Sequence, residues 1–518
     1  MSETTKEFKR QLPRNSVFQV LAFGVQVVTG ICLVPYLIRH LGTAAYGLIP
    51  VAGMLTQYVS LISQSISGAV NRFLTIALQK NDIKEANRVF STAFFSYLGI
   101  GLVQIPFFLL VIYFADSIVT IPDELYIDAL ILLACSAAAF ILNLVASVFG
   151  VPMYAYNRLD LSRSIDISRC LFRIVGIIAL FICLGPALRY VGYVDLTASF
   201  LLCIAQVAIA KHLAPMLKLR LFYFDRAKIR QLLGMGGWLL INTVGTLLFL
   251  RMDVWVCNRF VSADAAGEYA AVLQWATLIR SGGAITAAVV APMMMIYYAK
   301  SEIESLIRIS KVSVRVLSLA LAVPISLMCV FSPSLLHIWL GSSFMKLAPL
   351  MVIMLCHLVL NVGVMPLFSI QVAMNKVRLP ALVTLLMGAL NLVFAIVFIK
   401  YFDLGIYGVA IAGAIVLTAK NALFTPVYAA VMLRRPWYYF LTPYLSAIGL
   451  MIGLMTAGYV LRLYVAPVLL LHFALLFVFI GAIGVAAIWF ILPRSDCRSI
   501  LALLPGKLGI MPARSSGG

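Results

Sequence analysis

The chain has 518 residues, of which 63% are hydrophobic and 11% charged, and its mean hydropathy is +1.04. A soluble protein cannot bury that much apolar surface. Apolar runs of about 20 residues, each long enough to cross about 30 Å of hydrocarbon as a helix, recur from end to end. The composition therefore predicts an all-α polytopic membrane protein. Basic cytoplasmic loops explain the formal net charge of +20 better than nucleic acid binding does.

Fourteen transmembrane spans are predicted in chain order. The first follows a charged arm, residues 1–15, and lacks a small-residue cleavage signature, so it is interpreted as a retained helix and not as a signal peptide. A tight turn at Pro186 separates the fifth span from the sixth, and residues 494–518 form a tail. The spans cover roughly 16–38, 48–71, 91–114, 126–153, 171–187, 191–210, 236–258, 268–297, 312–332, 347–373, 380–399, 406–431, 440–461 and 466–492.

The basic residues test this order. With the N-terminus inside, 30 Lys and Arg residues fall on inner segments or at the inner ends of spans and 6 on outer loops, and the remaining three lie deep within spans: Arg251, Arg280 and Lys420. Positive residues collect on the cytoplasmic side of membrane proteins. The asymmetry predicts that both termini are cytoplasmic.

The sequence also carries an internal repeat. A shift of 220 residues without a gap pairs Arg39 with Arg259, Ala45 with Ala265, Gly47 with Gly267 and Lys80 with Lys300. The shift separates two blocks of six spans, and an even number gives both copies the same orientation. We therefore expect two parallel six-helix lobes, 16–230 and 231–435, with the substrate path between them. Two C-terminal helices, 436–493, lie outside the repeat.

The second predicted span carries a polar stripe. Its members recur at three- and four-residue steps and end next to Arg72: Gln57, Ser60, Gln64, Ser67 and Asn71. One interpretation is helix–helix packing through hydrogen bonds. The other is a water-filled lumen, which the stripe favours because it runs the whole depth of the span.

Arg280 lies deep in the eighth predicted span. The 220-residue shift pairs it with Ser60, so a stripe that faces a cavity predicts that Arg280 faces the same cavity. A permanent cation at that depth suits an anionic group such as phosphate, which guanidinium binds bidentately. The alternative is a structural ion pair with Asp253, which the prediction places as the only carboxylate deep in a span.

The seventh predicted span supplies the remaining candidates. Asn242, Thr246 and Asp253 share one helical face, which makes Asp253 a candidate for ion coupling or charge balance in the cavity. A structural pair with Arg280 or Arg251 is the alternative. Arg251 lies nearer the outer end, so it either lines the cavity or extends outward to the interface.

Weaker polar sets occur in other spans, among them Asn143, the pair His357 and Asn361, and the pair Lys420 and Asn421. For these, helix packing and a functional site both stay open. The nine cysteines are scattered without a C-x-x-C motif and the histidines lack metal-ligand grouping, so no metal or cofactor is predicted.

Several segments resemble a known family. The opening NSVFQVLAFGVQVVTGICLVPYLIRHLGTAAYGL resembles that of bacterial polysaccharide (O-antigen-type) flippases, and RMDVWVCNRFVSADAAGEYAAVLQ resembles their seventh-span signature. FSPSLLHIWLGSSF and ALNLVFAIVFIKYFDLGIYGVAIAGAIV are similar to their ninth-span exit and their eleventh and twelfth spans. The order of these segments is typical of the multidrug/oligosaccharidyl-lipid/polysaccharide exporter superfamily.

The resemblance implies two six-helix lobes around a cationic cavity, in which Arg280 and Asp253 match the expected charges. It implies a non-enzymatic flippase of the bacterial cytoplasmic (inner) membrane. The expected substrate is an undecaprenyl-pyrophosphate-linked repeat unit, moved by alternating access with its lipid tail in the bilayer. Membrane lipids and polysaccharide polymerase machinery are the expected partners. No nucleotide-binding motif is present, which favours ion antiport as the driving force.

Other functions have different requirements. A multidrug antiporter needs cavity acids for cationic drugs, and the first two predicted spans contain none. A lipid II flippase has a related architecture, but the arginine-rich pattern is missing from those spans. A membrane glycosyltransferase, polymerase or ligase needs catalytic groups on a substantial outer loop, whereas the predicted outer loops are short. A scaffold without transport would not explain a full-depth polar stripe.

Overall fold

The computed structural model describes residues 3–79, 82–225 and 237–464, with five further positions between 481 and 488. Every regular element in these ranges is helical, so the predicted fold class is confirmed. Eleven helices of the described chain are long and apolar enough to cross a membrane, and two shorter apolar helices, Thr43–Met54 and Ile241–Leu250, match the second and seventh predicted spans. The predicted span 466–492 falls almost wholly outside the described residues, so the count of fourteen stays a prediction.

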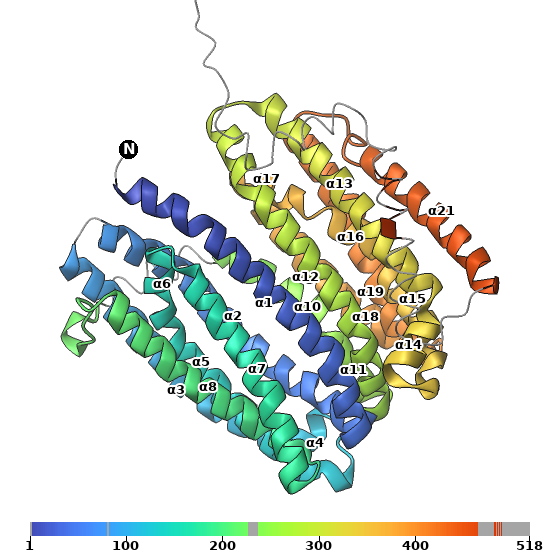
Figure 1. Cartoon of the computed structure of the whole chain (residues 1–518), viewed down its shortest axis with the longest axis horizontal. Helices are drawn as coiled ribbons and strands as arrows, with labels where there is room; N and C mark the ends of the chain where they lie inside the picture. Colours follow the sequence, from blue (N-terminus) through green and yellow to red (C-terminus); the bar gives the residue numbers. More distant parts are fainter. Residues whose placement is uncertain are drawn as a thin grey trace, which may run out of the picture. The chain divides into compact units, whose positions relative to one another are not determined.

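The N-terminal half contains long helices with short connections (Figure 1). Its elements are α1 (Glu3–Leu41), α2 (Thr43–Gln79), α3 (Ile83–Tyr113), α4 (Ala115–Ile118), α5 (Tyr126–Ala146), α6 (Val151–Ala155), α7 (Leu159–Leu184) and α8 (Leu188–Leu213). The turn predicted at Pro186 separates α7 from α8, where Gly185 has a φ of 83°. Such a positive φ suits glycine because it lacks a Cβ.

The C-terminal half contains more interrupted helices. Its elements are α10 (Gly237–Leu250), α11 (Met252–Phe260), α12 (Ala263–Ala299), α13 (Ile303–Val330), α14 (Ser332–Leu340), α15 (Ala348–Cys356), α16 (Leu358–Gly363), α17 (Pro366–Ala373), α18 (Arg378–Lys400), α19 (Gly405–Thr418), a π-helical turn η5 (Ala419–Phe424), α20 (Thr425–Met432) and α21 (Thr442–Tyr464). The predicted tenth span is thus three short helices, and the predicted twelfth span contains the π turn.

The predicted repeat reappears in the helix bounds. Adding 220 to the bounds of α2, Thr43 and Gln79, gives those of α12, Ala263 and Ala299. The same shift takes the start of α3 at Ile83 to the start of α13 at Ile303. Equivalent helices therefore begin at equivalent places in both halves, as a parallel repeat requires.

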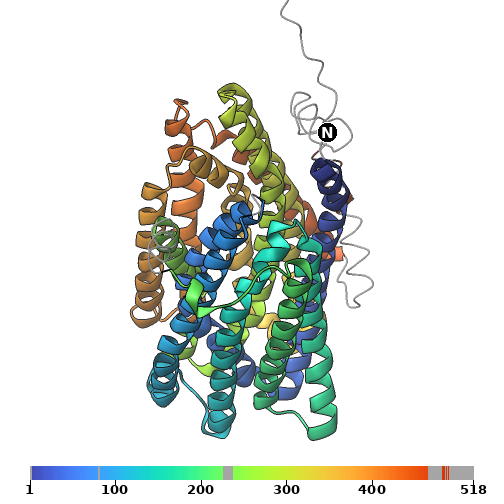
Figure 2. The ribbon, with the colours of Figure 1, turned by 90° about the vertical axis from the view of Figure 1, so that its left-hand side faces the viewer.

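The chain folds as two compact units. The first contains Met1–Gln274 and Arg378–Gly413, and the second contains Trp275–Val377 and Ala414–Gly518. In the first unit, α3 packs on α5, α5 on α8, and α8 on α7, and these helices run side by side in blue to green (Figure 2). Helices α10 and α11 pack on α2 and on α18 in the same unit. In the second unit, α13 packs against α16 and α21. The predicted lobe boundaries at residues 230 and 435 stay a prediction.

The repeat-related glycines Gly47 and Gly267 meet within the first unit. A Cβ at Gly267 would lie 2.0 Å from the backbone oxygen of Thr43, and one at Gly47 would lie 2.6 Å from the backbone nitrogen of Gly267. The Thr43 hydroxyl also donates a hydrogen bond to the carboxylate of Asp264. Only residues without a Cβ permit this backbone approach, which explains both glycines.

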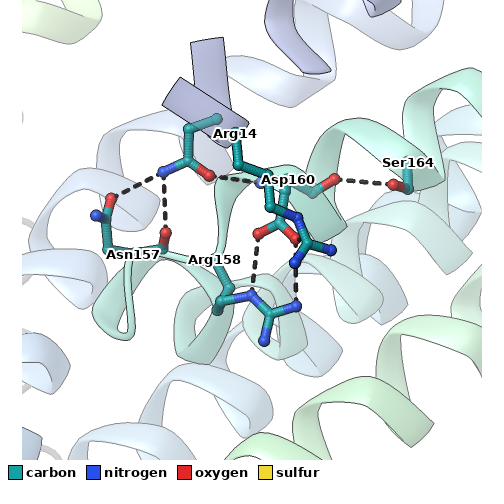
Figure 3. A network of polar contacts seen from close by, with 6 residues as sticks. Arg14, Asn157, Arg158, Asp160 and Ser164 are labelled. Carbon is teal, nitrogen blue, oxygen red and sulfur yellow. Dashed lines mark hydrogen bonds and ion pairs between the residues drawn. The ribbon is translucent and has the colours of Figure 1, made fainter. Parts of the chain in front are cut away.

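Asp160 connects the first half of α1 to the start of α7 (Figure 3). Its side chain is 1% exposed and accepts from Arg14 at 3.0 Å and from Arg158 Nε at 3.0 Å. The backbone nitrogen of Asp160 donates to Oδ1 of Asn15, and Nδ2 of Asn15 donates to the backbone oxygen of Asn157. These segments are predicted to lie on the same, inner side of the membrane, and their contacts agree with that.

Other contacts also join segments that are predicted to lie on the same side of the membrane. A predicted outer loop meets the outer end of the predicted seventh span, where Trp255 Nε1 donates to the backbone oxygen of Ile118 at 2.8 Å and Asn258 exchanges hydrogen bonds with the backbone of Thr120. Two predicted inner segments meet where the backbone nitrogen of Lys218 donates to Asn87 at 2.6 Å. Segments predicted on one side are therefore bonded to each other.

We expect Asp160→Asn to lower the free energy of unfolding by about 1–3 kcal/mol, because two arginines lose a buried carboxylate but keep partial access to water. Thermal unfolding of the detergent-solubilised protein, followed by size-exclusion chromatography after heating, measures this loss. The matched control is Asp166→Asn, because Asp166 and its ion-pair partner Arg163 are both exposed. It should cost at most about 0.5 kcal/mol. Equal losses in both variants would contradict a stabilising role of the Asp160 cluster.

Candidate functional site

Asp253 lies directly after a break in the predicted seventh span. Helix α10 ends at Leu250, Arg251 has φ −127° and ψ −25°, and α11 begins at Met252. The carboxylate therefore sits in the first turn of α11, where free backbone N–H groups favour negative charge. Asp253 is 7% exposed, whereas Arg251 is exposed. The predicted continuous span 236–258 is thus two helices.

Three helices of the first unit meet at Asp253. Tyr269 of α12 donates its hydroxyl to Oδ2 at 3.0 Å, and Asn391 of α18 donates Nδ2 to Oδ1 at 3.1 Å. Both partners are almost wholly buried. The sequence analysis singled out neither partner, although Asn391 is the only polar residue in the apolar run from Gly388 to Ile399.

The Asp253 cluster retains an unused acceptor. The buried Oδ1 of Asn391 has no hydrogen-bond partner. A Cβ at Gly413 of α19 would lie 3.8 Å from this oxygen and 3.8 Å from Asp253 Oδ2, so both oxygens face the same stretch of backbone. Carboxylate and amide oxygens are the ligands of hard cations, and a protonated carboxyl is also a donor. The chemistry of this cluster suits a proton or a hard cation.

Asn242 and Thr246 lie on α10, before the break. Both side chains are half-buried, and the Thr246 hydroxyl donates to the backbone oxygen of Asn242 at 2.8 Å. The break at Arg251 lies between these two residues and Asp253. That all three share one face stays a prediction.

Arg280 and a polar network occupy the second unit. Arg280 is half-buried on α12 and interacts electrostatically with His357, the residue between α15 and α16. The Asn361 amide nitrogen lies 2.7 Å from Nδ1 of His357 and 3.1 Å from the Thr418 hydroxyl. The amide of Asn421 donates to the backbone oxygen of Asn361 at 3.3 Å. The weak polar sets of the predicted tenth and twelfth spans therefore form one network.

That network also keeps unused acceptors. The buried side-chain oxygens of Asn361 and Asn421 have no hydrogen-bond partner. Both residues lie beside irregular backbone, Asn361 in a short helix and Asn421 in the π turn. Helix irregularities of this kind recur at functional sites.

The first unit contains a charged cluster that the sequence analysis missed. Arg173 of α7 lies 3.1 Å from the carboxylate of Asp195 in α8. Arg169 donates to Asn143 at 2.8 Å, and Asn143 donates to Ser199 at 3.0 Å. The expectation that Asp253 is the only carboxylate deep in a span is therefore wrong. The charges between residues 158 and 173 lowered the local hydropathy and hid the start of α7 at Leu159.

The polar stripe of the second predicted span lies on α2. Asn71 is half-buried, whereas the side chains of Gln57, Ser60, Gln64, Ser67 and Arg72 lie outside the described residues. The lumen that this stripe and Arg280 predict stays a prediction.

The fold and the charged side chains within its helices define a polytopic helical membrane protein with an internal repeat. Residues 12–298 match the family model described as "Polysaccharide biosynthesis protein". A relative from Bacillus subtilis (strain 168), the "Uncharacterized membrane protein EpsK", is 32% identical over 409 residues, which cover 79% of this chain and 81% of that protein. The chain belongs to the polysaccharide biosynthesis protein family.

Two solved transporter structures share this fold. The lipid II flippase MurJ in an inward closed conformation aligns with a TM-score of 0.69 and 12% identity, covering 94% of this chain and 98% of that one. An inward-facing multidrug resistance MATE family transporter of the MOP superfamily aligns with a TM-score of 0.67 and 13% identity, covering 82% of this chain and 98% of that one. These alignments show that the chain shares its fold with both transporters.

We expect Asn391→Leu to lower the free energy of unfolding by about 1–3 kcal/mol, because the buried Asp253 carboxylate loses a donor. The loss should shrink in Asp253→Asn, since the charge that needs the donor is gone, and a double-mutant cycle of thermal unfolding measures this coupling. Val393→Ala, an exposed position on the same helix, is the control and should change stability by at most about 0.5 kcal/mol. Additive losses in the cycle would show that the two residues do not act together.

Proposed function

We propose that this protein is a flippase that moves an undecaprenyl-pyrophosphate-linked polysaccharide repeat unit across the bacterial cytoplasmic (inner) membrane by alternating access. Its termini are cytoplasmic, and it performs no covalent chemistry. Membership of the polysaccharide biosynthesis protein family supports the substrate class. The solved neighbours with this fold are a lipid II flippase and multidrug transporters, which supports transport as the activity.

The position of Arg280 within a membrane helix is the main support for a pyrophosphate-linked substrate. A guanidinium is always charged, and its presence within a membrane helix is costly unless it meets an anion or water. A pyrophosphate presents several oxygens to the fork of N–H donors and is itself costly to move through hydrocarbon. The same cation disfavours a cationic drug as the substrate.

Asp253 is our candidate for coupling transport to an ion gradient. The carboxylate is buried, and the unused oxygen of Asn391 lies beside it, so the cluster gains a ligand when a proton or a hard cation enters. Entry of the cation neutralises the carboxylate and changes how α11, α12 and α18 hold together. Uptake on one side of the membrane and release on the other drives antiport of the lipid-linked unit.

The substrate enters from the inner leaflet, so membrane lipids surround the site of entry. Polysaccharide polymerase machinery that consumes the flipped units is the expected partner. An enzyme of the glycosyltransferase or polymerase class is disfavoured because the predicted outer connections are short, such as residues 185–187 between α7 and α8.

A strain that lacks the gene tests the role of Arg280. We expect Arg280→Ala to reduce surface polysaccharide at least tenfold and to leave lipid-linked repeat units on the cytoplasmic side, because the pyrophosphate loses its cation. Arg280→Lys should restore part of the product because it keeps the charge. Arg308→Ala removes an exposed arginine from the same unit and should leave polysaccharide unchanged. Normal polysaccharide from Arg280→Ala at normal protein level would contradict this role.

The coupling role of Asp253 is tested in membrane vesicles with an imposed proton or Na⁺ gradient. We expect Asp253→Asn to bind the lipid-linked unit but to lose the stimulation of transport by the gradient, because the side chain no longer changes its charge. Asp403→Asn alters an exposed residue whose φ of 51° asparagine also tolerates, so it serves as the control. Gradient-stimulated transport by Asp253→Asn at the normal rate would rule out Asp253 as the coupling group.

A further inference from the structure

Lys420 is a second cation inside the helices of the second unit. It lies in the π-helical turn between α19 and α20, and its Nζ is 4.7 Å from the centre of the Phe368 ring on α17. Among the residues that the structure describes, none forms an ion pair with Lys420. A contact with an aromatic face compensates an ammonium inside a membrane protein only in part. It therefore favours an anion as an additional partner.

The backbone around Lys420 is fixed. The Thr425 hydroxyl donates to the backbone oxygen of Lys420 at 3.0 Å, and the side chain of the neighbouring Asn421 is bonded to Asn361. A π turn adds one residue to a helical turn and is costly, so it is usually retained for a functional reason. Here the turn sets the direction in which Lys420 leaves its helix.

An apolar pocket of about 300 Å³ adjoins this cation within the second unit. Its walls come from α12 and α17: Ala284, Ala287, Ala288, Ala291, Met365, Phe368 and Ser369. Phe368 therefore belongs both to the pocket and to the contact with Lys420. The volume is at the lower end of the range for small-ligand sites, about 300–1,000 Å³.

Arg280 stands at one end of the same pocket wall. Arg280, Ala284, Ala287 and Ala291 follow one another at steps of four, three and four residues, so they share one face of α12. His357, which lies within the electrostatic reach of Arg280, is linked through Asn361 to Thr418, two residues before Lys420. One cation thus lies on the α12 face that lines the pocket, and another lies against the ring of Phe368, which also lines it.

We propose that this pocket binds the junction between the phosphate group and the first hydrocarbon units of the substrate lipid. Arg280 and Lys420 hold phosphate oxygens, and the alanines and Phe368 contact the hydrocarbon chain. This inference rests on the proposed function and adds to it. It makes Lys420 a substrate-binding residue and gives part of the lipid a place in the protein. An inorganic phosphate would contact only the cations, and a neutral lipid would contact only the apolar wall.

Binding of three probes to the purified full-length protein in nanodiscs tests this inference. The probes are a radiolabelled polyprenyl diphosphate, the corresponding polyprenyl alcohol and inorganic pyrophosphate. We expect Lys420→Gln to weaken binding of the diphosphate lipid at least tenfold and to leave the alcohol unaffected, because only the charge is removed. Ala288→Phe fills the pocket, so it should weaken both lipids and leave inorganic pyrophosphate unaffected. Lys420→Arg should retain most of the diphosphate-lipid affinity.

The control is Lys376→Gln, an exposed lysine of the same unit, which should bind all three probes as the wild type does. Wild-type affinity for the diphosphate lipid in both Lys420→Gln and Ala288→Phe would overturn this inference and leave the proposed function intact. Failure of the wild type to bind that lipid would contradict the proposed function itself. Equal affinities for inorganic pyrophosphate and the diphosphate lipid would contradict the lipid part of the site. If Lys420→Gln does not fold, unchanged lipid binding by Ala288→Phe alone overturns the inference.

Discussion

Hydrocarbon offers no hydrogen bonds, so every polar group within the membrane must find its partner inside the protein. Asp253 shows how strongly this constraint shapes the fold. The helix ends before it, its carboxylate occupies the first turn of α11, and Tyr269 and Asn391 come from two other helices to donate to it. A single buried carboxylate thereby fixes three helices relative to one another.

Some buried polar groups lack a full set of hydrogen-bond partners, and these groups indicate where function is located. Unused buried acceptors remain on Asn391, Asn361 and Asn421, and Lys420 relies on an aromatic face. Three of these four positions lie next to broken or π-helical backbone. A membrane protein that needed only stability would satisfy these groups or replace them with apolar ones. Their retention fits sites that receive an ion or an anionic substrate during a transport cycle.

Much of the fold follows from periodicity and composition. The 220-residue repeat pairs Gly47 with Gly267 in the sequence, and the same shift relates the bounds of α2 and α12. The helix breaks could not be predicted, because Arg251 and His357 are compatible with a continuous helix and only tertiary contacts decide their backbone. The pairing of Arg173 with Asp195 was hidden for another reason. Charges that are compensated between helices look like loop residues when each span is scored by itself. Arg280 and Asp253 could be predicted from the sequence as site residues. The residues that surround and contact them could not.

The central claim is movement of a pyrophosphate-linked lipid from one leaflet to the other, and a reconstituted system tests it most directly. Purified protein is placed in liposomes that carry a fluorescent polyprenyl diphosphate-linked sugar, and a membrane-impermeant quencher reports the outer-leaflet fraction over time. Our account predicts that active protein increases the exchange between leaflets, that an ion gradient gives it a direction, and that Arg280→Ala abolishes it. Exchange at the rate of protein-free liposomes, with correctly folded protein and a gradient in place, would contradict the account.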